Sequence, residues 1–259
     1  MSRRHLNPYR IGLGLIIRRL CWDLSYQSWL HRGKIKSIAG KYSGKKAVII
    51  CNGPGLRNIE FQKIGEIYTF GLNNINSIFE KTHFRPSSIV AVNPYVIKQN
   101  ADFYSETDIP LFLDYRARKI VNVKSETYLF HTSDHPYFAK DCEFSVYEGF
   151  SVTYVAMQLA FHMGFSDVAL VGCDHKYNYQ GEPNSVLSYD NRVGNHFADK
   201  YYPDDSEWQL PDLRASEYFF DLARREFTRD GRLLVNCSMP SDLTTIPRMT
   251  LEEFLMNEG

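Results

Sequence analysis

The sequence predicts an α/β domain built on a doubly wound, mostly parallel sheet. Short apolar runs rich in β-branched residues recur along the chain, and polar turns follow them. Such runs are typical of strands that are covered on both faces. The apolar helical stretch 151–163 is closed by Gly164 and leads directly into the strand-like run 167–172. A helix followed at once by a buried strand indicates a doubly wound, Rossmann-like arrangement.

The first predicted strand, residues 47–50, runs straight into a turn formed by Asn52, Gly53, Pro54 and Gly55. Glycine lets backbone N–H groups come close to a ligand, and proline fixes the turn. A helix beginning near Gly55 would direct its free N–H groups at a phosphate. An ordinary strand-to-helix turn has the same composition, so these residues alone leave both interpretations open.

Asparagines end three of the predicted strands. Further strands are predicted over residues 66–71, 87–92, 110–114, 127–131 and 232–236, and further helices over 211–229 and 251–256. The strand-end residues are Asn52, then Asn73 or Asn74, then Asn93. The carboxyl ends of parallel strands share one edge of the sheet, where open α/β folds bind ligands. An amide both donates and accepts hydrogen bonds, so the three indicate a site for a base, a ribose or a phosphate.

An irregular segment that follows the strand over 167–172 is the predicted lid, residues 173 to about 210. Between Cys173 and Asp205 it contains five tyrosines and two histidines and shows almost no periodicity. A long irregular segment at the ligand-binding edge is typical of a lid or binding loop. His175 and His196 are its candidates for a general base, and a solvated loop histidine is the alternative for each.

The N-terminal arm is strongly basic. Residues 1–46 hold 11 Lys and Arg and one acid, a net +10, which leaves −10 for the rest of a chain of net charge +0. A single amphipathic helix is predicted over Arg10–Leu30. Its apolar stripe consists of Leu13, Ile16, Ile17, Leu20 and Leu24. Basic residues beside apolar and Trp side chains suit an anionic membrane surface, although packing on the domain or on a second subunit explains them equally well.

Length and composition favour a basic arm over residues 1–44 and a single catalytic domain over 45–259. Five cysteines without a CxxC pair give no sign of zinc or of a disulfide framework and suit a reducing cytoplasm. The apolar run 11–17 is too short for a signal peptide or a membrane span. We therefore expect a cytoplasmic protein, peripheral on the inner face of the membrane if the arm binds lipid. The acidic body argues against a nucleic-acid partner.

The order of these motifs resembles two related groups of proteins. The motifs are AVIICNGPGL (47–56), LNN (72–74), AVNP (91–94), the stretch 149–178 and NHF (195–197). They look like the small bacterial CMP-sialic acid-dependent sialyltransferases. They look still closer to the uncharacterised 6-hydroxymethylpterin pyrophosphokinase-like (MptE-like) family, whose patterns also match Gly172–Tyr177, Asn236 and Pro247-Arg248. The resemblance covers about residues 45–250 and implies a Rossmann-like fold of the GT-A-variant kind.

The sialyltransferase resemblance also implies roles for individual residues. The nucleotide would lie against Asn52, Gly53, Pro54 and the turn they form, although Gly55 stands where that group has serine. Asn73 or Asn74 and Asn93 would contact ribose and phosphates, and Ser151 would face the donor. His196 would be the catalytic base, with His175 as its competitor, Tyr177 and Tyr179 would contact the phosphate, and Asp174 would belong to the nucleotide site.

The resulting hypothesis is an inverting glycosyltransferase that needs no metal. It would transfer a sugar from a nucleotide-activated, CMP-linked donor to a glycan acceptor in bacterial surface polysaccharide or lipopolysaccharide assembly. One alternative is a pterin pyrophosphokinase that uses ATP and magnesium, with Asp174 as the metal-binding carboxylate. A non-catalytic nucleotide-sugar binding protein is another. The oligomeric state is left open.

Overall fold

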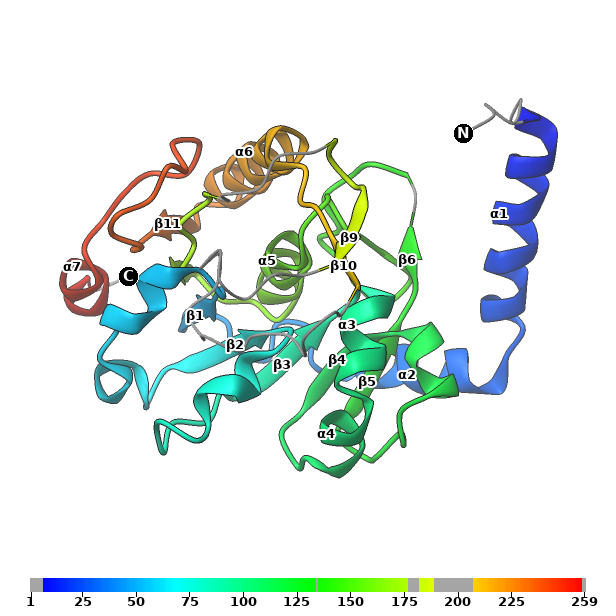
Figure 1. The fold of residues 1–259 in the computed structure, drawn as a ribbon, viewed down its shortest axis with the longest axis horizontal. Helices are drawn as coiled ribbons and strands as arrows, with labels where there is room; N and C mark the ends of the chain where they lie inside the picture. The colour runs from blue at the N-terminus through cyan, green and yellow to red at the C-terminus, as the bar shows by residue number, and fades with distance from the viewer. Residues whose placement is uncertain (1–6, 134, 177–181, 189–206, 258–259) are drawn as a thin grey trace.

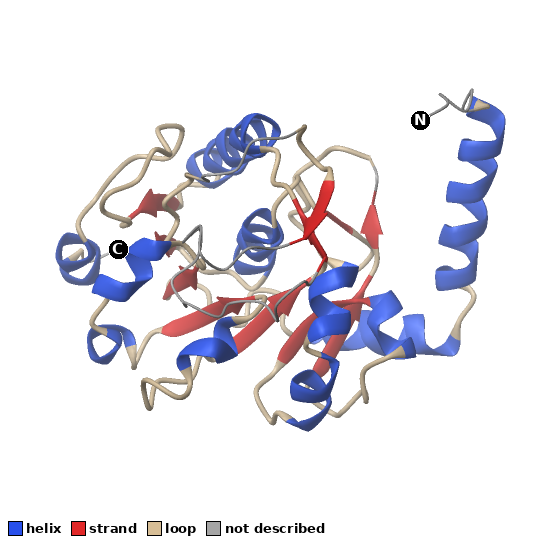
Figure 2. Ribbon diagram, viewed as in Figure 1, coloured by secondary structure: helices blue, strands red, loops and turns tan. Residues whose placement is uncertain are grey.

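The structure is a computed structural model that describes residues 7–133, 135–176, 182–188 and 207–257. Its centre is a seven-stranded sheet in which every pairing is parallel (Figures 1 and 2). The strands are β1 (Lys46–Ile50), β2 (Tyr68–Leu72), β3 (Ser88–Ala91), β4 (Leu111–Asp114), β5 (Thr127–Phe130), β8 (Asp167–Val171) and β11 (Leu233–Asn236). The doubly wound α/β class predicted from the apolar runs is confirmed.

The strand order places a switch point in the middle of the sheet. The order is β11-β8-β1-β2-β3-β4-β5. The chain moves outward from β1 to β5 and then returns to lay β8 against the other side of β1, with Lys46 opposite Asp167. The connections that follow β1 and β8 therefore lead in opposite directions along the sheet, and open α/β folds bind ligands at the carboxyl edge beside such a switch point.

Helices cover both faces of the sheet (Figure 2). One core cluster joins the sheet to α2 (Tyr26–Ser37), α5 (Val152–His162) and α6 (Leu213–Arg229). The opposite cluster joins it to α3 (Pro94–Gln99), α4 (Ala101–Glu106), α7 (Leu251–Met256) and the 3-10 turns η1 (Pro54–Asn58), η2 (Phe61–Ile64), η3 (Ile75–Ile78) and η4 (Tyr115–Lys119). The alternation of side chains along β1, with Ile49 in one cluster and Ile50 in the other, fills both cores.

The N-terminal arm differs from its prediction. In place of one helix over Arg10–Leu30, the structure has α1 (Pro8–Asp23) and α2, separated at Leu24 and Ser25. The Ser25 hydroxyl explains the break, because its oxygen accepts the Ser28 N–H at 3.1 Å and caps α2. Within the described residues, no helix is both long enough and apolar enough to cross a bilayer.

The second helix of the arm belongs to the compact part of the molecule. Ile35 and Ile38, which precede the predicted domain boundary at residue 45, lie in the core. α2 also covers the edge strand β5, where the ring nitrogen Nδ1 of His31 accepts the Leu129 N–H at 3.2 Å. This bond satisfies a backbone donor that an uncovered edge would leave free.

Part of the segment predicted as an irregular lid forms regular secondary structure. β9 (Val186–Ser188) pairs antiparallel with β10 (Glu207–Gln209), and Asn184 donates its N–H to the Leu210 carbonyl at 2.8 Å. A second short pair, β6 (Thr132–Ser133) with β7 (Val146–Tyr147), lies within a stretch that the sequence left unassigned. Both ribbons lie beside the carboxyl edge of the sheet (Figure 1).

Candidate functional site

A cavity of about 650 Å³ opens at the switch point of the sheet. Its walls come from the loops after β1, β2, β3 and β8, the first turn of α5, the start of α6 and Gln209 of β10. Elements from both sides of the crevice thus contribute to one cavity. This is the edge at which the strand-end asparagines predict a ligand.

The turn after β1 is built differently from the predicted phosphate loop. The Gly53 N–H donates to the Gly172 carbonyl at 2.9 Å, and the Gly55 N–H donates to Asp174 Oδ2 at 2.6 Å. A Cβ on Gly53 would lie 2.6 Å from that carbonyl oxygen, and one on Gly55 would lie 2.4 Å from Asp174 Oδ1. Glycine is therefore required here because two loops of the protein approach each other. Pro54 begins η1, a single short turn, where the prediction allowed a longer helix.

Two of the predicted asparagines bring polar groups to the cavity and also organise its wall. Asn52 donates from Nδ2 to the Leu72 carbonyl at 2.8 Å and so ties the ends of β1 and β2 together. Asn93 caps α3 by accepting the Tyr95 N–H at 2.9 Å, and its Nδ2 lies 3.4 Å from Gln209 Oε1. Both residues line the cavity.

Asn73 and Asn74, which the sequence could not separate, have different surroundings. Asn73 lines the cavity in a left-handed conformation with φ of 48°, and within the described parts of the chain its buried Oδ1 has no hydrogen-bond partner. Asn74 is buried elsewhere, and its Oδ1 accepts from Asn100 Nδ2 at 2.5 Å. The structure therefore brings Asn73, and not Asn74, to the cavity.

The first turn of α5 forms another wall. The Ser151 hydroxyl caps this helix by accepting the Thr153 N–H at 3.2 Å, and both residues line the cavity. Aligned peptide dipoles place partial positive charge at a helix N-terminus. An anionic group of a ligand would be favoured at this end of the helix.

Asp174 follows β8 and presents an unsatisfied carboxylate oxygen. Oδ2 accepts the Gly55 N–H, whereas the buried Oδ1 has no hydrogen-bond partner among the described residues. Burial raises the pKa of this carboxyl, and the hydrogen bond from Gly55 opposes the shift. A ligand hydroxyl that donated to Oδ1 would satisfy it.

His175 is held against α6. Its Nε2 lies 3.4 Å from Glu217 Oε1, its ring centroid is 5.8 Å from that of Phe220, and the ring is hydrogen-bonded to the backbone of Leu213. Burial lowers the pKa of this histidine, so the neutral ring is favoured near pH 7. His175 lines the cavity, but these contacts suit a positioning residue better than a mobile base.

Three residues of the predicted site, His196, Tyr177 and Tyr179, lie outside the described residues. Their roles stay predictions.

Arg116 is a cavity residue that sequence reasoning missed. Its Nε donates to Asp114 Oδ1 at 2.6 Å, and the Thr132 hydroxyl donates to the other oxygen of this buried carboxylate at 2.7 Å. The guanidinium Nη2 lies 3.7 Å from Glu148, and Arg18 of α1 lines the same cavity. The sequence contains a signal for this part of the site, because Asp114, the partner of Arg116, is a polar residue at the end of a strand, as the asparagines are.

The model of the 6-hydroxymethylpterin diphosphokinase MptE-like family matches residues 25–180. The chain belongs to the MptE-like family. The match begins after α1 and includes the loops that follow β1, β2 and β3 and the start of the segment after β8. The resemblance drawn from the sequence motifs is thereby confirmed for this family.

Among solved structures, the MptE-like chain is similar to the MAf glycosyltransferase from Magnetospirillum magneticum AMB-1. The two share 13% sequence identity with a TM-score of 0.51, and the match covers 88% of this chain and 39% of that one. At this identity the likeness shows the fold. A search of curated proteins found no match.

The described part of this MptE-like site contains backbone, amide, hydroxyl, carboxylate and guanidinium groups. A helix N-terminus and Arg116 can stabilise negative charge, and Asp174 can accept a hydrogen bond. Within the described residues, no group of three or more His, Cys, Asp or Glu side chains is placed to hold a metal ion.

Proposed function

We propose that this protein is a glycosyltransferase that binds a nucleotide-activated, CMP-linked sugar at the switch point of the sheet. The acceptor would be a glycan of a bacterial surface polysaccharide or lipopolysaccharide. The observation that carries the proposal is Asp174, whose buried Oδ1 has no partner among the described residues and which lines the same cavity as the N-terminus of α5. A nucleotide sugar has a partner for each feature. Its ribose hydroxyls can donate a hydrogen bond to Asp174 Oδ1, and its anionic phosphate suits the N-terminus of α5. The fold shared with a glycosyltransferase adds support.

In this proposal, the reaction is a direct displacement with inversion. The acceptor oxygen attacks the anomeric carbon, the bond from that carbon to the phosphate oxygen breaks, and His196 takes the acceptor proton. The charge that develops on the departing phosphate would be stabilised by the first turn of α5, Arg116 and the lid tyrosines Tyr177 and Tyr179. We propose that these donors suffice without a metal ion.

A second candidate is a pterin pyrophosphokinase, because the matched family is described by that activity. It would transfer diphosphate from ATP, and Asp174 would help to bind magnesium near the phosphates. The two candidates differ in the nucleotide and in the need for magnesium. A protein that binds nucleotide sugars without reaction is a third reading, and His196→Ala would then leave ligand binding and biological activity unchanged.

The deciding experiment is a thermal-shift screen with CMP, UDP, GDP, ADP and ATP, each with and without magnesium. A ligand that binds only the folded state raises the melting temperature. At a ligand concentration of about a hundred times the dissociation constant, it raises the free energy of unfolding by about 2.7 kcal/mol. We expect CMP to raise it equally with and without magnesium, and Asp174→Asn to reduce the shift. A shift produced only by ATP with magnesium would favour the pyrophosphokinase.

A further inference from the structure

The helix α1 stands away from the rest of the described chain (Figure 1). It carries an apolar stripe whose side chains are exposed, so no described part of the domain covers it. The stripe repeats at the three- and four-residue spacing of one helix face. Its members, each between 48% and 80% exposed, are Leu13, Ile16, Ile17, Leu20 and Leu24. Tyr26, Trp29 and Leu30 at the start of α2 are also exposed and extend the apolar surface beyond the end of α1.

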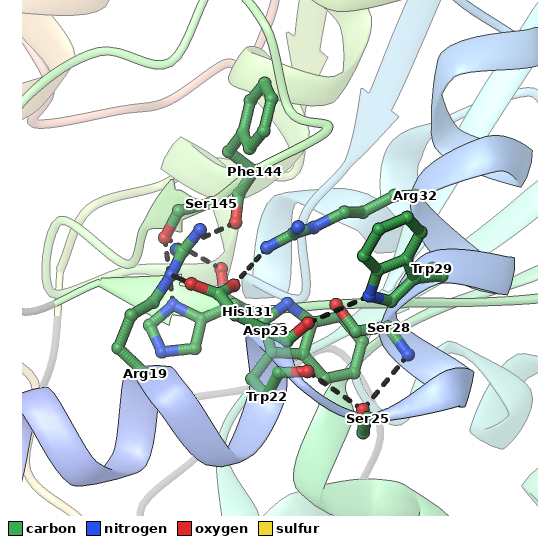
Figure 3. Close-up of polar contacts among 10 residues, drawn as sticks. All are labelled: Arg19, Trp22, Asp23, Ser25, Ser28, Trp29, Arg32, His131, Phe144 and Ser145. Carbon is green, nitrogen blue, oxygen red and sulfur yellow. Dashed lines mark hydrogen bonds and ion pairs between the residues drawn. The ribbon is translucent and has the colours of Figure 1, made fainter.

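A polar cluster at the α1–α2 corner holds α1 in this position (Figure 3). Asp23 accepts from Arg19 Nε at 2.8 Å and also pairs with Arg32 of α2. Arg19 donates further to the Phe144 carbonyl at 3.0 Å, and Trp29 Nε1 donates to the Asp23 carbonyl at 3.0 Å. Bonds from three separate segments thus converge at the corner, and they favour a fixed direction for α1 over a free tail.

Trp22 anchors the same end of the helix. Its side chain is 1% exposed, and its ring centroid lies 4.9 Å from that of Tyr115. Trp22 lies on the side of α1 opposite the stripe and is buried in the body of the protein. The stripe therefore points away from the body. The exposed face is a consequence of how α1 is attached.

Charge and the distribution of apolar residues indicate what covers the stripe. Residues 1–46 carry a net charge of +10, so two arms facing each other would repel. Eleven of the eighteen exposed large hydrophobic side chains among the described residues belong to residues 9–30, and the other seven are scattered from Ile120 to Met256. The described body offers no matching apolar face on which the arm of a second copy would dock.

We propose that α1 docks on the surface of an anionic phospholipid bilayer. The stripe enters the interface, Tyr26 and Trp29 lie among the headgroups, and Arg10 and the other basic residues of the arm attract anionic lipid. Arg18, on the opposite side of α1, lines the cavity. Docking would therefore hold the cavity close to the membrane surface, a property that is independent of the nucleotide and sugar in the proposed function.

The test is co-sedimentation of the full chain with vesicles of phosphatidylcholine alone and with vesicles that also contain phosphatidylglycerol. We expect binding to the anionic vesicles only, and weaker binding at high salt. The double variant Leu13→Gln, Ile17→Gln should lose at least about tenfold in affinity, since each side chain gives up apolar burial. The matched control is Ile120→Gln, Met256→Gln, which changes two exposed apolar side chains elsewhere and should bind like the wild type.

Both variants alter exposed residues, so unchanged melting temperatures would show that the fold is intact. Trp29 supplies a second measurement, because its fluorescence should shift to shorter wavelength on anionic vesicles, and Trp29→Phe should remove the shift. Equal vesicle binding by the stripe variant and the wild type would overturn the proposal. The proposal would also be overturned if the wild type were an oligomer and the stripe variant a monomer, since a second copy would then cover the stripe.

Discussion

At the scale of single residues, the contact between Gly55 and Asp174 makes a sharp prediction about stability. Gly55→Ala should lower the free energy of unfolding by about 1–3 kcal/mol, because its Cβ would meet Asp174 Oδ1 at 2.4 Å. The matched control is Gly33→Ala in α2, where nothing lies within 4 Å of the new Cβ. This second change should raise stability by up to about 1 kcal/mol. Urea denaturation measures both, and equal stability of Gly55→Ala and wild type would contradict the contact.

The two lid histidines should respond differently to alanine. His196→Ala is expected to bind donor nucleotide normally and to lose about 10²–10⁴-fold in turnover, as a missing general base would. His175→Ala should raise the Michaelis constant more than it lowers turnover, because the Leu213 backbone and the Phe220 ring hold His175 at the cavity wall. Steady-state kinetics with a CMP-linked donor separates the two. Near-normal turnover in His196→Ala would assign the base elsewhere.

At the scale of elements, the attachment of α2 to β5 should depend on pH. Burial, with smaller contributions from Lys34 and Arg118, lowers the pKa of His31 from 6.5 to about 4. The unfolded chain then binds more protons than the native state between these values, so stability should fall as the pH drops from 6.5 to 4. Protonation also removes the Nδ1 acceptor for the Leu129 N–H.

The matched variant is His31→Gln, which cannot titrate in this range. Urea denaturation at several pH values should give it a shallower loss of stability than the wild type. His131 is also buried, with its pKa lowered to about 4, so part of the dependence should remain. An identical slope in both proteins would show that His31 does not contribute.

Elements with a strong local signal could be predicted from the sequence, and elements held by distant contacts could not. The buried strands and the helices α5, α6 and α7 begin and end within about two residues of their predicted bounds, because apolar periodicity defines them. The β6–β7 pair has no such signal. It depends on bonds such as that from the Tyr137 hydroxyl to the Ser145 carbonyl and on Gln158 Nε2, which donates to the Tyr147 carbonyl.

The site residues likewise divide into those that a local sequence signal predicts and those whose role depends on distant contacts. The placement of Asn52, Asn73 and Asn93 at the cavity follows from the rule that parallel strands end at one edge. The role of the glycines does not, because the partner of Gly55 is 119 residues away in the chain. Asn52→Ala should therefore weaken nucleotide binding and also lower stability somewhat, because Asn52 Nδ2 donates to the Leu72 carbonyl.

At the scale of the whole molecule, the N-terminal part of the chain combines an excess of positive charge with most of the exposed large apolar side chains of the described residues. Residues 1–46 carry a net charge of +10 and the remaining chain −10. The exposed apolar stripe belongs to the same part of the chain. A protein divided in this way would meet an anionic surface in a preferred orientation.

The cavity draws its walls from both sides of the switch point, with Asn73 on the β2 side and Asp174 and His175 on the β8 side. A ligand that contacts both sides would hold the loops on the β2 side and on the β8 side together, because neither side could open until the ligand had dissociated. Amide hydrogen exchange should therefore slow together in the loop after β2 and in the first turns of α6 when CMP is added. ATP with magnesium serves as the comparison, and slowing confined to one side would show that the bound nucleotide does not bridge the two halves of the sheet.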